Sequence, residues 1–203
     1  LTLVSDGTVS ATGAMVIDEL ALQGTADYTL DNAGNQISLL AAGREAERIG
    51  TLTVANTTTA LEVGTLGTQN GIYTTGDVDL TSADADLIVN QAIDTESTSA
   101  SALTLTETGS AGVTTLNANI TSVGDQTYSG DQAGSHDVVV ANNVTLEATG
   151  TDSADSDITL TGNTASAANT ERLTLVADGA VSHGGALEID ELALQGTADY
   201  TLD

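Results

Sequence analysis

The sequence predicts an all-β fold, a parallel β-solenoid, and three observations support that prediction. Short apolar–polar–apolar triplets, often with threonine in the middle, recur along the 203-residue chain. This period-two alternation is typical of half-buried strands. The chain has no Phe, Trp, Cys or Pro and four Tyr, so aliphatic side chains must fill a core of thin cross-section. Clusters of Gly, Asn, Asp and Ser between the triplets supply turns.

The triplets are the predicted strands, and stacking them buries faces that no single triplet buries alone. They lie at residues 1–3, 20–22, 37–39, 52–54, 78–80, 103–105, 144–146, 158–160 and 173–175, with a further candidate around Asn119. About nine stacked rungs per repeat unit, at about 4.8 Å each, predict an advance of about 43 Å. Outward threonines such as Thr104, Thr106 and Thr108 are explained by ordinary β-propensity rather than by an ice-binding face.

A long internal repeat sets the domain organisation. The first 31 residues return at a constant offset of 172 in residues 173–203. We therefore expect one complete solenoid unit, residues 1–172, followed by the start of the next unit, residues 173–203. A chain that begins at Leu1 and ends inside a second copy is expected to be a piece of a longer array. Six aligned pairs differ: Ser5/Ala177, Thr8/Ala180, Ala11/His183, Thr12/Gly184, Met15/Leu187 and Val16/Glu188.

Two of these exchanges predict the direction of side chains. An exchange of Val16 for Glu188 requires a solvent-facing position, whereas an exchange of Met15 for Leu187 conserves volume in a core. Neighbouring strand residues point to opposite faces, so Val16 outward places Met15 and Ile17 inward. Leu20 and Leu22 break that phase, which predicts two short strands joined by a bend near residues 18–19.

One stretch, residues 38–50, departs from the strand pattern. It contains two of the three cationic residues, Arg44 and Arg48, four positions apart, with Glu45 and Glu47 between them. This pattern is compatible with one or two helical turns or with a charged loop that leaves the stack. The loop is interpreted either as a self-neutralised, solvated excursion or as a docking element for a neighbour.

A string of sandwich domains is the rival architecture. Such domains have about 100 residues, so a unit of this length would hold two of them. They normally contain an inward Trp or Tyr and boundaries rich in proline. The chain contains neither Trp nor Pro and no visible linker, which favours the solenoid.

The charge of the chain excludes several classes of partner. Three Arg against 29 Asp and Glu give a net charge of −26 and a pI near 4.1. Binding of nucleic acid by counterion release requires clustered cationic residues, and binding to an anionic membrane surface requires them too. With three Arg and no cluster of cations, the chain is not expected to bind either. No apolar stretch is long enough to insert in a membrane. The absence of cysteine excludes disulfides and thiol chemistry.

Residues able to support catalysis are few. Ser135, His136 and Asp137 are consecutive, so they cannot converge as a catalytic triad requires. Polysaccharide cleavage would need a carboxylate pair with one raised pKa. Asp84 and Asp86, two apart and therefore expected on one strand face, lack the apolar wall that would raise it. We expect the protein not to be an enzyme.

Calcium binding explains the clustered acids better than catalysis does, since carboxylates and turn carbonyls provide hard oxygen ligands. The candidate calcium ligands are Asp152, Asp155 and Asp157, then Asp84 and Asp86. A solvated, salt-adapted acidic surface explains the same residues without a bound ion. No cofactor is required by the sequence, and calcium is the one ion to test.

One segment resembles a known family. Residues 125–130, DQTYSG, are followed by Val138-Val139-Val140 and then by Asn143-Val144-Thr145-Leu146. This succession resembles a phrase common in filamentous-haemagglutinin-like adhesins, which are very large bacterial exoproteins. The chain differs from the family by the polar insertion at residues 131–137 and by its acidity. The resemblance implies a right-handed parallel β-helix and a role as a secreted or surface-anchored stalk.

The function expected from these observations is mechanical. We expect a structural repeat segment of an extracellular or cell-surface bacterial fibre or adhesin, acting in adhesion, cell–cell contact or biofilm cohesion. Its expected partners are adjacent copies of the repeat end to end, with lateral association through divalent cations and contact with surface glycans also open. The alternative is a module whose excursions, around Arg44 and at residues 131–137, bind a polysaccharide or a partner. A polysaccharide-degrading β-helix that uses Asp84 is the third hypothesis.

Overall fold

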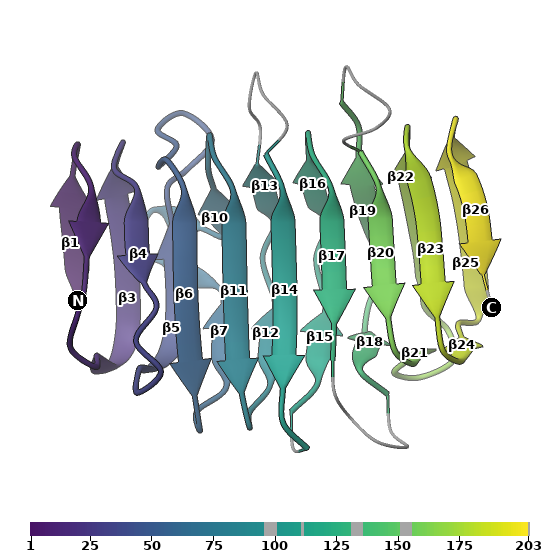
Figure 1. The fold of residues 1–203 in the computed structure, drawn as a ribbon, viewed down its shortest axis with the longest axis horizontal. Helices are drawn as coiled ribbons and strands as arrows, with labels where there is room; N and C mark the ends of the chain where they lie inside the picture. The colour runs from purple at the N-terminus through teal and green to yellow at the C-terminus, as the bar shows by residue number, and fades with distance from the viewer. Residues whose placement is uncertain (96–100, 111, 131–135, 151–155, 203) are drawn as a thin grey trace.

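The chain is built from short parallel strands. The computed structural model describes residues 1–95, 101–110, 112–130, 136–150 and 156–202, and no helix occurs among them. Nine strands form one sheet, which Figure 1 shows as an unbroken front layer along the long axis of the molecule. In spatial order they are β2 (Val9–Ser10), β4 (Tyr28–Leu30), β6 (Leu52–Thr57), β11 (Val78–Ala83), β14 (Leu103–Thr108), β17 (Gln126–Ser129), β20 (Ile158–Thr161), β23 (Ala180–Gly184) and β26 (Asp199–Leu202).

A second sheet of 15 strands divides into two arms that share β3 (Val16–Gly24) and β5 (Gln36–Ala42). The first arm contains β7 (Leu61–Val63), β12 (Leu87–Val89), β15 (Thr114–Leu116), β18 (Val138–Val140), β21 (Thr164–Ser166) and β24 (Leu187–Glu188). The second arm contains β1 (Thr2–Ser5), β10 (Ile72–Tyr73), β13 (Ile93–Thr95), β16 (Ile120–Ser122), β19 (Val144–Ala148), β22 (Arg172–Ala177) and β25 (Glu191–Gly196). All pairings in both large sheets are parallel. A separate antiparallel hairpin joins β8 (Thr65–Leu66) and β9 (Gln69–Asn70).

From β6 onward the chain visits the nine-stranded sheet, the first arm and the second arm in a fixed order. The passage β6–β7–β10 is followed by β11–β12–β13 and then by β14–β15–β16, and each strand pairs with its counterpart in the next passage. We call one such passage a coil. This topology confirms the prediction of an all-β fold with parallel strands and is consistent with a β-solenoid.

The number of coils is smaller than the sequence predicted. Seven pairing steps along the nine-stranded sheet lead from Val9 in β2 to Val181 in β23, the equivalent position of the second copy. Seven steps along the second arm likewise lead from Leu3 to Leu175. The expected nine rungs, and the advance of about 43 Å, were wrong because triplets on different sheets were counted as separate coils. Seven steps give an advance of about 34 Å.

The bend expected at residues 18–19 is present in the second copy of the repeat and absent from the first. In the second copy the segment forms two strands, β24 and β25, interrupted at Ile189 and Asp190, in agreement with the predicted bend. In the first copy β3 runs through without interruption, although Asp18 has no partner in its pairing with β5. The predicted directions are confirmed: Val16 is 69% exposed, while Met15 and Ile17 pack against the core.

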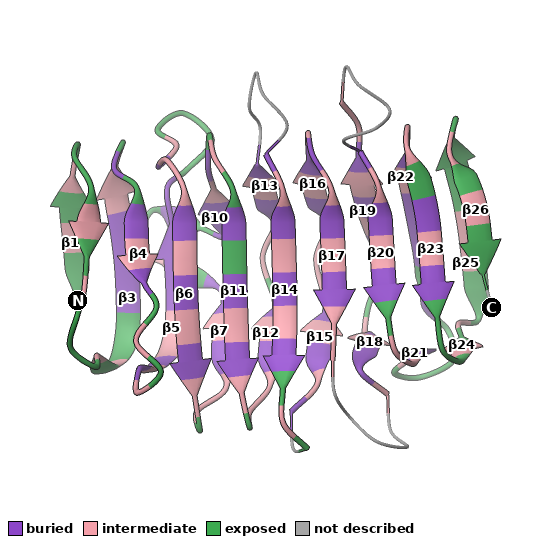
Figure 2. Ribbon diagram, in the orientation of Figure 1, coloured by how far each residue is buried: buried purple, intermediate pink, exposed green. Residues whose placement is uncertain are grey.

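Aliphatic rows fill the interior, as the composition requires. Buried residues alternate with partly exposed ones along strands such as β6 and β14, and Figure 2 shows this as purple and pink bands across the front sheet. Stacked equivalents from successive coils form continuous rows, because a one-residue slip would turn every apolar side chain outward. One such row contains Leu22, Ala42, Ile72, Ile93, Ile120, Leu146 and Leu175, all at most 1% exposed.

Tyr128 is the one fully buried aromatic whose hydroxyl is bonded to another side chain. It donates a hydrogen bond of 2.8 Å to Oε1 of Gln126, which is itself buried. Burial raises the pKa of the Tyr128 hydroxyl well above its ordinary value of 10.0. The neutral hydroxyl is therefore part of the folded state, and its contribution to stability is fully present below about pH 10.

We expect Tyr128→Phe to flatten the alkaline decrease of stability. Above about pH 10 the unfolded Tyr128 ionises while the folded one does not, so the free energy of unfolding falls by up to about 1.4 kcal/mol per pH unit from this residue alone. The variant loses that slope, and it is about 1 kcal/mol less stable at neutral pH because Oε1 of Gln126 loses its donor. Urea unfolding followed by circular dichroism at a series of pH values measures both effects. An unchanged alkaline slope would contradict the prediction.

Candidate functional site

Many acidic side chains in the turns hold neighbouring coils together. Four aspartates directly precede strands of the nine-stranded sheet: Asp27 before β4, Asp77 before β11, Asp125 before β17 and Asp157 before β20. The Oδ1 atoms accept backbone N–H groups of Thr51, Ala102, Asp157 and Ala180, one coil further on, at 2.8, 2.9, 2.9 and 2.5 Å. Each carboxylate thus satisfies a backbone donor at a point where the chain turns.

The calcium candidates that the structure describes belong to this group of turn residues. Asp157 accepts from the N–H of Ala180 and donates its own N–H to Asp125. Asp86 accepts from the N–H of Val113 at 3.0 Å. Asp84 lies in the same turn with a left-handed φ of 57°. Asp152 and Asp155 lie outside the described residues.

The expectation that Asp84 and Asp86 share a strand face was wrong. Both follow the end of β11 and lie in the turn before β12, because the strand alternation stops at Ala83. In the described ranges, no three side chains among His, Asp and Glu gather closely enough to hold a metal ion together. Asp86 and Asp157 therefore have an evident structural role, the acceptance of turn N–H groups, whether or not an ion binds.

We expect Asp157→Ala to lower the free energy of unfolding by about 1–3 kcal/mol, because the N–H of Ala180 loses its carboxylate acceptor. Asp157→Asn retains an oxygen acceptor at the same position and is expected to cost less than about 1 kcal/mol. Urea unfolding of the two variants in parallel measures the difference. Equal losses would show that the carboxylate charge, rather than the hydrogen bond, matters at this turn.

His136 and Asp137 engage different parts of the structure. Nε2 of His136 lies 3.5 Å from Oε2 of Glu188, whereas the buried Asp137 accepts the N–H of Asn163 at 2.7 Å. Ser135, the third member of the consecutive set, lies outside the described residues. The pair thus contacts two separate places in the later coils, strand β24 and the turn between β20 and β21.

The predicted excursion is shorter than residues 38–50 and is not helical. Residues 36–42 belong to β5, and a tight turn follows in which Arg44 and Glu47 exchange backbone hydrogen bonds. Their side chains also form an ion pair. Arg48 anchors the turn: its guanidinium donates to both carboxylate oxygens of Asp94, at 3.1 and 3.0 Å, and lies 5.4 Å from the centre of the Tyr73 ring.

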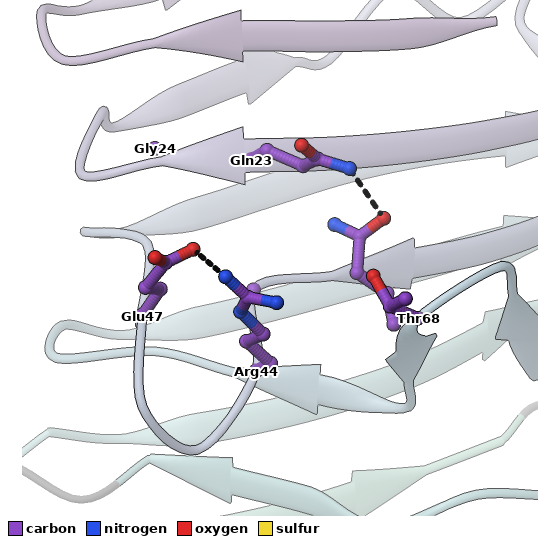
Figure 3. Close-up of a pocket in the computed structure, with 7 residues that line it drawn as sticks. Gln23, Gly24, Arg44, Glu47 and Thr68 are labelled. Atoms are coloured by element: carbon purple, nitrogen blue, oxygen red, sulfur yellow. Dashed lines mark hydrogen bonds and ion pairs between the residues drawn. The ribbon is translucent and has the colours of Figure 1, made fainter.

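A polar pocket lies between this turn and the β8–β9 hairpin (Figure 3). Gln69, 2% exposed, is fixed by hydrogen bonds to the backbone oxygen of Leu22 and to the Gln23 amide. The Arg44–Glu47 pair faces these amides across the pocket, with Thr68 at the tip of the hairpin. Amide, hydroxyl, guanidinium and carboxylate groups in one concavity can bind a hydroxyl-rich ligand through hydrogen bonds.

Sequence reasoning missed two uses of polar residues. The turn carboxylates were detectable, since an Asp directly precedes the first apolar residue of several predicted strands, as at Asp77 and Asp157. His183 was not: it is 2% exposed and lies inside the nine-stranded sheet, where Nε2 is 3.2 Å from Oγ1 of Thr164. Its equivalent in the first copy is Ala11, so the repeat gave no sign of a core imidazole.

No protein-family model, curated protein or solved structure matches this chain. In the described ranges, no helix has the length and apolar character needed to cross a membrane.

Proposed function

We propose that the chain is a rigid, non-enzymatic segment of an extracellular or cell-surface bacterial fibre, a stalk for adhesion or cohesion. In this proposal the coils close into a right-handed parallel β-helix. The handedness is supported by the general preference for right-handed parallel crossovers, about 98% of cases. The adhesin resemblance at residues 125–146 supports the same architecture and the extracellular location.

The observation that carries the proposal is the agreement between strand register and sequence repeat. The ladders of two different sheets connect Val9 with Val181 and Leu3 with Leu175, both pairs 172 positions apart, after the same number of coils. A unit that returns in phase can be followed by another unit without a change of register. Repetition then lengthens the rod at constant width.

The exposure of equivalent residues supports end-to-end contact between copies. The large hydrophobic residues exposed in the described structure are Leu1, Val4, Val16, Leu194 and Leu202, all in the first or last coils. Leu1 is 57% exposed, whereas its equivalent Leu173, stacked on β19, is fully buried. An adjacent copy stacked in the same register would cover the inward-facing Leu1, Leu194 and Leu202, whose equivalents are buried, and would pair the strand edges that otherwise favour aggregation.

Particle length measured by electron microscopy tests the rod. We expect proteins carrying one and two additional 172-residue units to lengthen by about 34 Å per unit at constant width. Visible beads, or an increment about twice as large, would indicate separate domains and overturn the proposal.

The pocket beside Arg44 supports a second candidate function, the binding of a surface polysaccharide. Its donors and acceptors suit sugar hydroxyl groups. Glycan-array binding by the 203-residue chain should then be lost in Arg44→Ala. Binding should be retained in Arg172→Ala. This control removes a different arginine, whose ion pair with Glu191 is longer, at 3.6 Å, and does not line the pocket. Absence of glycan binding by the unmodified chain would leave the stalk function alone.

A further inference from the structure

The outer face of the nine-stranded sheet carries a continuous row of hydroxyl side chains. Register pairing places nine residues in one outward row across its nine strands, and eight of them are Ser or Thr. The exception is Asp79. In order the row contains Ser10, Thr29, Thr53, Asp79, Thr104, Thr127, Thr159, Ser182 and Thr201.

A second outward row runs beside the first, two residues further along six of the nine strands, from β6 to β23. It contains Ala55, Thr81, Thr106, Ser129, Thr161 and Gly184. Hydroxyl groups also bond along the rows, from Ser129 to Thr106 at 3.2 Å and from Ser182 to Thr159 at 3.3 Å. We call the two rows together the hydroxyl face.

The other two outer surfaces differ in composition, so β-propensity alone does not explain the hydroxyl face. A corresponding outward row on the first arm contains Glu62, Ile88, Thr115, Val139, Ala165 and Glu188. On the second arm it contains Tyr73, Asp94, Thr121, Glu147, Val176 and Gln195. Each of these rows has one threonine and two acids, although all three surfaces are formed by β-strands.

Charge distinguishes the hydroxyl face further. The chain has 29 acids and three cations, yet Asp79 is the one carboxylate in the two rows of the hydroxyl face. Approach through either arm brings together rows that each contain two acids, and like charges across a contact are costly. Approach through the hydroxyl face places mostly short uncharged side chains against one another, with aspartates such as Asp77 at the edge of the face, two residues before Asp79.

We propose that two copies of the chain associate side by side through their hydroxyl faces. The inference rests on the proposed rod and adds the surface by which rods adhere laterally. The sheet length is roughly 38 Å for nine strands, which gives a contact of roughly 1,200 Å² in total, at the lower limit of specific interfaces. Association of single chains is therefore weak, and it strengthens as additional units multiply the contact.

Other occupants fit the face less well. A second copy carries the same net charge of −26, which opposes its approach at low salt, but unlike a nucleic acid it offers matching rows of hydroxyl groups; a cationic partner is attracted to the acidic arms instead. Sugars commonly stack on aromatic rings, but Tyr28, Tyr128 and Tyr200 all belong to inward rows of this sheet. A second copy is a partner whose surface is equally flat and periodic and carries the same rows of hydroxyl groups.

Engineered cysteines test the inference cleanly, because the chain contains none of its own. Thr127→Cys places a thiol on the hydroxyl face, between Thr104 and Thr159 in register. Thr121→Cys is the matched control. It lies in β16, the strand that precedes β17 in the sequence, on the second arm between Asp94 and Glu147 in register. Both variants of the 203-residue chain are oxidised at the same protein concentration, and the disulfide-linked dimer is measured by non-reducing electrophoresis.

We expect the Thr127→Cys dimer to form about fivefold faster than the Thr121→Cys dimer, and faster at about 1 M than at about 0.1 M salt, where the Debye length is about 3 and 10 Å. Sedimentation of the unmodified chain should show the same rise of dimer with salt. Equal rates for the two cysteines would overturn the inference, as would a chain that stays monomeric at both salt concentrations. Circular dichroism shows whether each variant is folded. Neither result changes the rod length measured by electron microscopy, so the two proposals fail separately.

Discussion

Leu22→Ala is expected to lower the free energy of unfolding by about 2–5 kcal/mol, whereas Leu194→Ala lowers it by less than about 1 kcal/mol. The two leucines are equivalent positions of the repeat, within 15 residues of identical sequence, 17–31 and 189–203. Leu22 is fully buried between β1 and β5, while Leu194 in the last coils is 41% exposed. The difference between the variants therefore reports the stacking of coils, with local sequence held constant.

Urea unfolding of the unmodified chain and both variants measures this difference. Because repeat arrays can unfold in parts, the slope of each transition needs to be compared as well as its midpoint. Equal losses in the two variants would show that Leu194 is covered in solution, as it would be in an end-to-end assembly of copies. Dilution then distinguishes the cases, since an assembly-dependent loss decreases with protein concentration.

Gly71→Ala is expected to cost about 3 kcal/mol or more. Gly71 has a φ of 96°, and a Cβ at this position would lie 2.1 Å from the backbone oxygen of Ala92 in the next coil. The backbone there is fixed by the hydrogen bond from Ile72 N–H to the same oxygen, 3.0 Å long. The substitution must therefore separate two stacked coils as well as strain the residue.

Gly67→Ala is the matched control for Gly71→Ala. Gly67 lies in the tip of the β8–β9 hairpin with a φ of 65°, but nothing lies within 4 Å of the position of a Cβ. We expect a cost of about 1 kcal/mol, from the left-handed conformation alone. Thermal unfolding of the two variants gives the comparison, and similar melting temperatures would contradict the close stacking of coils at Gly71.

Strand positions were predictable where the alternation is strict. The triplets at residues 78–80, 103–105 and 158–160 all lie in the nine-stranded sheet with their apolar members buried, because a strand with one buried face must alternate. The number of coils was not predictable in the same way. A triplet such as 144–146 looks the same whichever sheet or arm it occupies, and here it belongs to the second arm.

The use of the acidic residues also required the tertiary structure. The partner of Asp157 is the N–H of Ala180, 23 residues away, and the partner of Arg48 is Asp94, 46 residues away. Coil lengths vary along this chain, so spacing in the sequence does not show which turns become neighbours. For the same reason the hydroxyl face became visible only once the register aligned Thr104, Thr127 and Thr159.

The two copies of residues 17–31 separate what is local from what is tertiary. In both, the tyrosine hydroxyl donates to the backbone oxygen of the glutamine five residues earlier, Tyr28 to Gln23 and Tyr200 to Gln195. The sequence alone determined that local bond, the alternation and the repeat. The tertiary structure decides burial: Leu30 is fully buried, and the equivalent Leu202 is 36% exposed. Identical segments differ because a coil buries its apolar row only against its neighbours, and only stacking in three dimensions supplies them.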